Sequence, residues 1–328
     1  MHKTTKLHRW LTAAGSSLAL ASVAACGGSG GENNVSNDKV ATVEVGDIQG
    51  TPASFLLFGK KKGIFADHDL KLKVKKQQGG AAIIPGLVSG ELDIGGSNIV
   101  SVLLGRSKGL PIQIISAGTS VGKDPEHDFS GLVVAKDSPI RSADDLAGKT
   151  IAVNTLKNVN DVVIKAALQK RGVDVSGLHF VEMGFPDMLA AVAKHRVDAA
   201  AEIEPFVTVA KSQGARVVLH PYVGAQPGLE IGTYTTSKKF IAEHGAVVAR
   251  FQQAATATAK YISAHPDEYR RALPETAGLK KNLADKVTLP VWTGKVDKGS
   301  LKFFADNMVK YGLVDKAPDT KAAVHWAE

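Results

Sequence analysis

The stretch GKTIAVNTLKNVNDVV, residues 148–163, decides the fold. Its apolar run at 150–153 predicts a short buried strand, residues 154–158 a polar turn, and the apolar spacing from Val159 a helix. A strand that turns into a helix places free backbone N–H groups and small polar side chains at one point. In an open α/β sheet that point is the carboxyl edge, where ligands bind. An ordinary capped helix is the alternative, and this stretch alone does not separate the two.

Strand-like and helix-like segments alternate on both sides of this stretch, which indicates an α/β fold with mostly parallel sheets and right-handed crossovers. The strands are expected at 40–46, 70–75, 92–96, 111–117, 129–136, 150–153, 179–182, 197–203, 216–219 and 229–235. Thr51 and Pro52 begin the first helix, and the pattern restarts after residues 137–140. From Lys238 onward the pattern is almost entirely helical.

One short pattern occurs twice, 105 residues apart. Asp93 and Asp198 each follow a small apolar helix, stand between apolar residues and lead into a strand that ends at a helix. The separation is too long for a solenoid repeat, so the echo favours two similar α/β lobes. We expect both aspartates to tie a turn rather than to bind a ligand.

The first 39 residues differ from the rest in composition. Three positive charges before residue 10 and an apolar run at 11–25 form a secretory signal, too short and too rich in Ser and Ala for a membrane helix. The run ends Val-Ala-Ala before Cys26, the single cysteine of the chain, as in a bacterial lipobox. We expect a signal peptide at 1–25, lipid modification of Cys26, and a flexible tether over 26–39.

Composition excludes several classes of protein. The 328 residues are 44% hydrophobic and 22% charged, which is typical of a globular chain with two cores. The formal charge is +8, of which three lie in the signal segment, leaving +5. The remaining lysines form no stripe interleaved with aromatic residues, so no nucleic-acid partner is expected. The ten histidines show no ligand spacing, so neither a metal nor a cofactor is expected.

A set of short motifs resembles one family of transport proteins. They are GKKKGIF (59–65), LVSGELDIG (87–95), KDSPI (136–140), DDLAGKTIAV (144–153), VDAA (197–200) and EPF (204–206). Each is weak alone, but their order and the lipobox together resemble the solute-binding lipoproteins of ABC importers. The similarity is to the branch for nitrate, sulfonate, taurine and thiamine precursors, and it covers most of residues 40–240.

This resemblance implies a two-lobe type II periplasmic-binding-protein fold. Lobe one would comprise 40–133 plus 233–328 and lobe two 134–232, with hinge strands near 130–134 and 232–236 and a ligand cleft between the lobes. The chain would be a monomer, lipid-anchored on the extracytoplasmic face of the cell membrane. It would deliver a small solute to an ABC permease and would not be an enzyme.

The same resemblance, applied position by position, places a set of polar and aromatic side chains in the cleft. They are Thr51, Ser97, Asn98, Thr119, Asn154, Thr155, Asn158, Glu204, Thr233 and Tyr234. Phe185, in the loop 184–186, is a further candidate that either stacks on a ring of the ligand or belongs to the core. Glu204 ends a strand before a helix start, and facing the cleft it would favour an amine over an anion. On this interpretation, we expect Glu204→Gln to weaken the binding of a cationic ligand. An anion held by helix N-termini stays open, so the residues do not separate a sulfonate-like anion from an amine-bearing heterocycle.

A secreted hydrolase or desulfurising enzyme on the same fold is the alternative. Gly118–Gly122 reads G-T-S-V-G, the G-x-S-x-G pattern of serine hydrolases, but no helical periodicity follows Ser120. The sequence AGKT at 147–150 ends like a phosphate loop, yet it lacks the first glycine and precedes its strand. The sequence therefore favours a binding protein over an enzyme.

Overall fold

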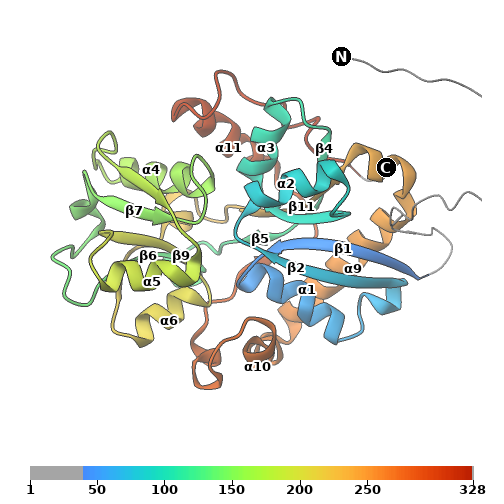
Figure 1. Cartoon of the computed structure of the whole chain (residues 1–328), viewed down its shortest axis with the longest axis horizontal. Helices are drawn as coiled ribbons and strands as arrows, with labels where there is room; N and C mark the ends of the chain where they lie inside the picture. The colour runs from blue at the N-terminus through green and yellow to red at the C-terminus, as the bar shows by residue number, and fades with distance from the viewer. Residues whose placement is uncertain (1–39, 327–328) are drawn as a thin grey trace, which may run out of the picture. The chain divides into compact units, whose positions relative to one another are not determined.

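The computed structural model describes residues 40–326. The signal peptide at 1–25, Cys26 and the tether at 26–39, all expected from the sequence, lie outside the described residues. Two five-stranded mixed sheets, each flanked by helices, stand beside each other (Figure 1). The expected α/β class is confirmed.

The first sheet has the strand order β2-β1-β3-β11-β4. Its strands are β1 (Ala41–Ile48), β2 (Leu70–Gln77), β3 (Ile94–Asn98), β4 (Ile112–Ala117) and β11 (Gly232–Ser237). The parallel part, β2-β1-β3, is connected by helices α1 (Thr51–Lys61) and α2 (Gly80–Ser89), and α3 (Ile99–Ser107) leads to β4. β11 is antiparallel to both β3 and β4.

The second sheet repeats this plan with the order β8-β7-β9-β6-β10. Its strands are β6 (Ser130–Val134), β7 (Thr150–Val153), β8 (His179–Glu182), β9 (Ala199–Ile203) and β10 (Arg216–Leu219). Its helices are α4 (Val159–Lys170), α5 (Phe185–Ala193), α6 (Phe206–Ser212) and α7 (Pro221–Ala225). β6 is antiparallel to both of its neighbours, as β11 is in the first sheet.

The repeated aspartates occupy equivalent places in the two sheets. Asp93 Oδ2 accepts a hydrogen bond from the Glu44 N–H at 2.8 Å, and Asp198 Oδ2 accepts one from the Thr150 N–H at 2.8 Å. Each aspartate thus ties the turn before a central strand to the neighbouring parallel strand. The structural role expected for both residues is confirmed.

Two chain segments cross between the sheets. One runs from β5 (Thr119–Ser120) to β6, the other from α7 to β11, and they are hydrogen-bonded to each other, for example Val121 N–H to Leu229 O at 3.0 Å. The expected hinge strands at 130–134 and 232–236 instead lie inside the sheets, because β6 and β11 are antiparallel inserts between two strands. The crossing segments precede them.

The C-terminal part is helical, as the sequence predicts. Its helices are α8 (Lys238–Glu243), α9 (Gly245–Ala264), α10 (Pro266–Thr276) and α11 (Lys298–Lys310). Short 3₁₀ turns lie at Ala66–His68, Pro125–His127, Ala143–Leu146 and Lys281–Lys286, and β12 (Val291–Trp292) pairs with β5. α11 packs against both α3 and α4, so it touches the helices of both sheets.

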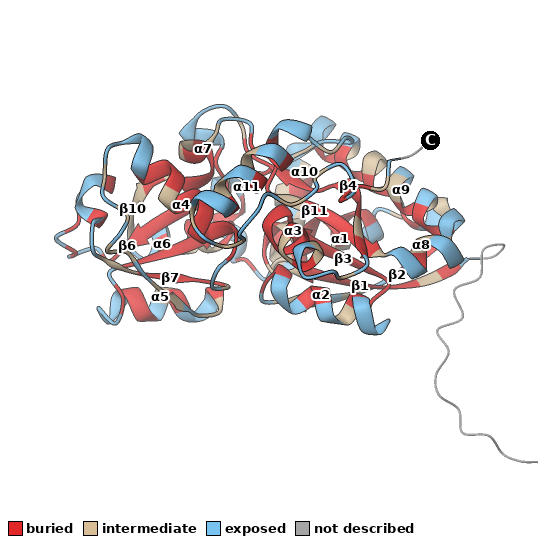
Figure 2. Cartoon of the chain, turned by 90° about the horizontal axis from the view of Figure 1, so that it is seen from above, coloured by how far each residue is buried: buried red, intermediate tan, exposed pale blue. Residues whose placement is uncertain are grey.

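Apolar side chains form two clusters. One surrounds Phe58, Phe251 and Tyr269 and joins α1, α9 and α10 to β1 and β2. The other joins α2 and α3 to the second sheet and its helices. Buried residues follow the strands and the inner helix faces (Figure 2).

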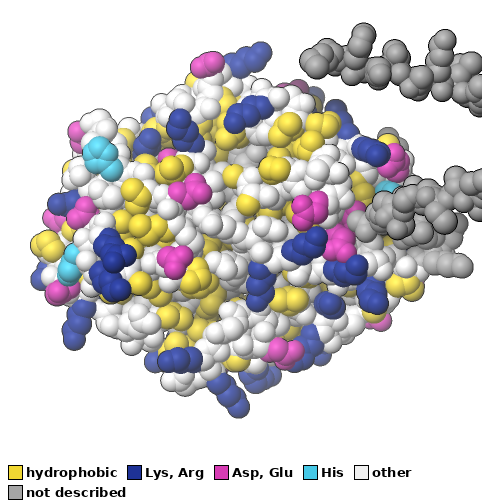
Figure 3. Space-filling model, viewed as in Figure 1, with side chains coloured by type: hydrophobic (Ala, Val, Ile, Leu, Met, Phe, Trp, Pro, Cys, Tyr) yellow, Lys and Arg dark blue, Asp and Glu magenta, His cyan; other side chains and the backbone are white. Residues whose placement is uncertain are grey.

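Charged side chains are scattered over the surface. On the face drawn in Figure 3, Lys and Arg side chains are spread among acidic and apolar ones rather than gathered in one basic surface. Among the helices of residues 40–326, none combines the length and the apolar character needed to cross a bilayer. Those same residues hold no cluster of three or more His, Cys, Asp or Glu side chains suited to a metal ion.

Candidate functional site

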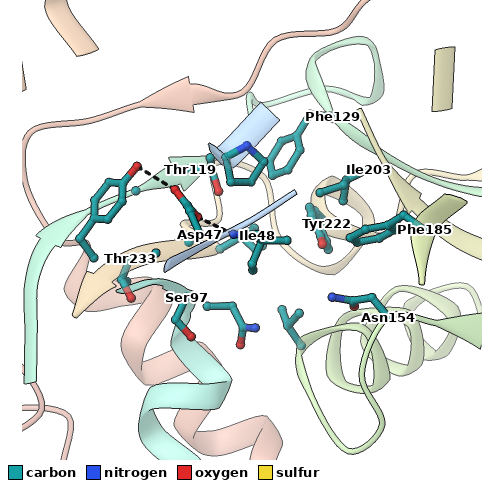
Figure 4. Close-up of a pocket in the computed structure, with 18 residues that line it drawn as sticks. Asp47, Ile48, Ser97, Thr119, Phe129, Asn154, Phe185, Ile203, Tyr222 and Thr233 are labelled. Carbon is teal, nitrogen blue, oxygen red and sulfur yellow. Dashed lines mark hydrogen bonds between the residues drawn. The ribbon is translucent and has the colours of Figure 1, made fainter. Parts of the chain in front are cut away.

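A small cavity lies between the two sheets, where strands of both end (Figure 4). The first sheet contributes β1, β3 and β11, and the second contributes the end of β9 and the loop after β7. The cavity has a volume of about 40 Å³, which is room for only a few water molecules. The carboxyl ends of β1, β3 and β9 thus form the site, as expected for this kind of sheet, together with the beginning of the antiparallel β11.

Most of the side chains expected in the cleft line this cavity. They are Ser97, Asn98, Thr119, Asn154, Phe185, Thr233 and Tyr234. Ser97 and Thr233 stand directly opposite each other in the antiparallel β3–β11 pair. Both hydroxyls are buried and lack a hydrogen-bond partner within the described part of the chain. A buried hydroxyl without a partner is costly, so these two groups are suited to a polar ligand.

The deciding stretch forms the strand β7, a turn and the helix α4, and its asparagines bond to the first sheet's connections. Asn154 Nδ2 donates to Gln78 O at 3.0 Å, and Gln78 Nε2 donates back to Asn154 O at 2.9 Å. Asn158 caps α4 and also bonds to the Ser101 hydroxyl, at 2.9 Å from Nδ2. Asn158 is therefore both the cap of α4 and a contact across the cleft.

Four expected residues do not line the cavity: Thr51, Thr155, Asn158 and Glu204. Thr51 donates its backbone N–H to Glu204 O at 3.0 Å. Thr155 faces Gly79, where an added Cβ would lie 2.3 Å from its hydroxyl oxygen. These residues lie at the rim, where the two sheets touch.

Glu204 turns its carboxyl group into the start of α6. Oε2 accepts from the Thr208 N–H at 3.0 Å, and Oε1 accepts from the Thr208 hydroxyl at 2.9 Å and the Thr288 N–H at 3.2 Å. Burial raises the pKa of Glu204 to about 7 despite these bonds. The carboxyl group serves the helix end rather than the cavity.

This placement changes the expectation for a substitution at Glu204. We expect Glu204→Gln to shift the relative affinity for cationic and anionic solutes by less than about threefold, under about 0.7 kcal/mol. The reason is that the carboxyl group bonds to α6 and not to the cavity. Isothermal titration calorimetry with one solute of each charge measures the shift, and a loss confined to the cationic solute would contradict the placement.

The sequence missed one charged group in the cavity, Asp47. Its Oδ1 accepts from the Ile48 N–H at 2.7 Å, and the Tyr234 hydroxyl donates to Oδ2 at 3.4 Å. Burial raises the pKa of Asp47 to about 7. Gly96 makes room for this group, because a Cβ there would lie 2.1 Å from Oδ1. The available signal was an acidic residue at the end of an alternating strand, just before the expected Thr51.

Aromatic rings form one wall of the cavity. Phe185 lines it and stacks on Phe206 with ring centres 5.4 Å apart, and Phe129 meets Tyr222 edge to face at 5.3 Å. The other missed lining residues are Ile48, Pro52, Val159, Ile203, Ile231 and the glycines Gly96, Gly118 and Gly232. In the sequence, apolar residues of this kind cannot be distinguished from ordinary core residues.

The chain resembles known binding proteins. It is 26% identical to the taurine-binding periplasmic protein of Escherichia coli (strain K12) over 210 residues, 64% of this chain and 61% of that protein. It is 25% identical to the formylaminopyrimidine-binding protein of Halalkalibacterium halodurans over 218 residues, 66% of this chain and 64% of that protein. The alignment thus spans less than two thirds of each of these relatives.

Solved structures support the fold. The alkanesulfonate-binding protein SsuA from Xanthomonas axonopodis pv. citri, bound to MOPS, superposes with a TM-score of 0.74 at 18% identity, covering 88% of this chain and 99% of that one. The expected periplasmic-binding-protein fold is therefore confirmed. A family model described as "NMT1/THI5 like" matches residues 51–269, well over half of the chain. On this match the chain belongs to the NMT1/THI5-like family.

Proposed function

We propose that this protein is the extracytoplasmic solute-binding component of an ABC importer. It captures a small polar solute between its two sheets and delivers the solute to a membrane permease. The observation that carries this proposal is the buried cavity between the sheets, into which Ser97 and Thr233 present hydroxyl groups without protein partners. The names of the related proteins, which bind taurine, formylaminopyrimidine and alkanesulfonate, agree with it.

The cavity is suited to two classes of solute. One is a sulfonate-, nitrate- or taurine-like anion, held by hydroxyl groups and backbone N–H groups. The other is a thiamine-precursor-like heterocycle, stacked against the ring of Phe185. The cavity offers groups for both.

Binding in this proposal closes the molecule around the solute. The boundary between the lobes follows the sheets: β6 belongs wholly to the second sheet, so lobe one would end before residue 130 rather than at 133. The two lobes would move about the two crossing segments. The bonds between Gln78 and Asn154, and between Ser101 and Asn158, join the two sides in the arrangement described here. They would form on closure and hold the solute inside.

The expected attachment to the membrane is part of the same proposal. Signal cleavage after Ala25 would leave Cys26 as a lipidated N-terminus, and the segment to residue 39 would tether a monomeric body near its permease. Two anchoring features of the sequence support this, the lipobox and the Gly- and Ser-rich segment that follows it.

The enzyme alternative has less support. Ser120 lies in β5, pairs with Val291 and does not line the cavity. A 3₁₀ turn, rather than the helix that the G-x-S-x-G pattern requires, follows it. The related proteins named above are binding proteins.

A thermal-shift screen tests the receptor function. The purified protein is heated with sulfonates, nitrate, taurine, pyrimidines and flavins in turn. A solute that binds the folded state tightly is expected to raise the unfolding midpoint by several degrees. The absence of a shift with every solute would count against a receptor for these compounds.

A further inference from the structure

We propose that the carboxyl group of Asp47 selects a solute bearing a nitrogen that is positively charged or donates a hydrogen bond. Solutes that are only anionic, such as nitrate or a simple sulfonate, are then poor ligands. This inference rests on the proposed receptor function and narrows its solute class. It is carried by the position of Asp47 in the cavity and by the charges around it.

Asp47 is one of the buried residues that line the cavity. Its carboxyl group lies over Gly96 of β3, between the Tyr234 hydroxyl and the Ile48 N–H (Figure 4). Only 2% of the residue's surface is exposed. A carboxylate offers about four acceptor positions. Two of these positions accept hydrogen bonds within the protein: a short one from the Ile48 N–H at 2.7 Å and a long one from the Tyr234 hydroxyl at 3.4 Å. Acceptor capacity is left for a ligand.

No cationic side chain balances this group within the described chain. The cavity lining contains no Lys, Arg or His. Lys76 is the register partner of Asp47 on β2, but its ammonium group donates to Thr276 O at 3.3 Å. Tyr234 and Tyr269 are the titratable groups that interact with Asp47, and burial raises the pKa of each, which keeps both neutral.

A buried carboxylate without a cation is unfavourable and repels a second negative charge in a medium of low polarity. A solute ammonium or amine next to Asp47 would remove that penalty by a charge-assisted hydrogen bond. Ser97 and Thr233 are then available to the other polar end of the solute. A zwitterionic aminosulfonate and an amine-bearing heterocycle both meet this requirement through the same nitrogen.

Matched pairs of solutes test the inference by isothermal titration calorimetry. Taurine is compared with isethionate, which carries a hydroxyl in place of the ammonium, and 4-aminopyrimidine with 4-methoxypyrimidine, which has no N–H donor. A hydrogen bond to a charged group is worth about tenfold or more in affinity. The nitrogen-bearing member of the pair that binds is expected to be favoured by at least that factor. Which pair binds separates the aminosulfonate from the heterocycle.

The Asp47→Asn variant tests whether Asp47 causes the preference for the nitrogen-bearing solute. It is expected to weaken the nitrogen-bearing solute about tenfold or more, and to leave the oxygen analogue unchanged or tighter. Asp93→Asn is the matched control, because Asp93 is also buried in the first sheet and accepts a backbone N–H at 2.8 Å, but does not line the cavity. It should keep the wild-type ratio. Unfolding midpoints show that both variants are folded.

The outcomes separate this inference from the receptor function. An oxygen analogue that binds as tightly as its partner, or equal effects of Asp47→Asn and Asp93→Asn, would overturn the role of Asp47 and leave the receptor function standing. Tight binding of nitrate or another bare anion in the thermal screen would do the same. Absence of binding by every solute would reject the receptor function and this inference with it.

Discussion

Replacing Gly79 with valine is expected to weaken solute binding roughly ten- to hundredfold. Gly79 precedes α2 in extended backbone, with φ −169° and ψ 171°, so valine fits its conformation. A Cβ there would lie 2.3 Å from Thr155 Oγ1 and 2.8 Å from Asn154 Nδ2, on the other side of the cleft. Overpacking of this kind costs about 1–3 kcal/mol, which here opposes closure rather than folding.

Affinity and stability measured together show where the cost arises. Titration with the solute found in the thermal screen should give the weaker affinity, while urea unfolding without solute should change little. Gly184→Val is the matched control. Gly184 also precedes a helix in extended backbone, and a Cβ there would meet nothing nearer than 3.5 Å. Equal affinities for the two variants would show that the contact at Gly79 does not limit closure.

Much of the fold could be predicted from the sequence because its signals are local. Apolar runs of strand length, helix starts such as Thr51-Pro52 and the asparagine cap at Asn158 each act over a few residues. The repeated Asp93 and Asp198 revealed the two similar halves. The position of β6 and β11 inside the sheets could not be predicted, because pairing between segments about 100 residues apart has no local signature.

The position of the cavity could be predicted from the sequence, but the direction of each side chain could not. Several residues predicted at strand ends line the cavity, since the carboxyl edges of the strands converge there. The side-chain direction changes with each residue of a strand, and a shift by one separates Ile203, which lines the cavity, from Glu204, which bonds to α6. The same uncertainty hid Asp47, because the first strand was expected to end at Gly46 and extends to Ile48.

The second large effect is an unfolding midpoint that falls as the pH rises from 5 to 8, measured without solute. Burial raises the pKa of Asp47 from 3.8 to about 7, of Glu204 from 4.5 to about 7 and of Glu230 from 4.5 to about 8. Burial also raises the pKa of Glu202, whose two carboxyl oxygens find no partner among residues 40–326. These carboxyl groups are protonated more readily in the folded chain than in the unfolded one.

The sign follows from proton linkage. A group whose pKa is raised by folding stabilises the folded state fully below its unfolded pKa, and this contribution is lost as the pH rises through the folded value. For these groups the window runs from about pH 4 to 8. Each pKa unit corresponds to about 1.4 kcal/mol, so the combined loss is expected to be on the order of several kcal/mol.

Carboxyl groups whose pKa is lowered by folding affect the stability only at a pH below this range. Hydrogen bonds from Lys62 and Tyr261 lower the pKa of the partly exposed Glu268, so its contribution is lost only in acid. Scanning calorimetry at pH 5, 6, 7 and 8 should therefore show a smaller fall for Glu230→Gln and the full fall for the control Glu268→Gln. Glu230 is the more sensitive choice because burial raises its pKa to about 8, although the Asp297 N–H donates a hydrogen bond to its carboxyl group. A midpoint that rises steadily from pH 5 to 8 in the unmodified protein would mean that these buried groups ionise without cost, and that the cavity at Asp47 is better solvated than its burial indicates.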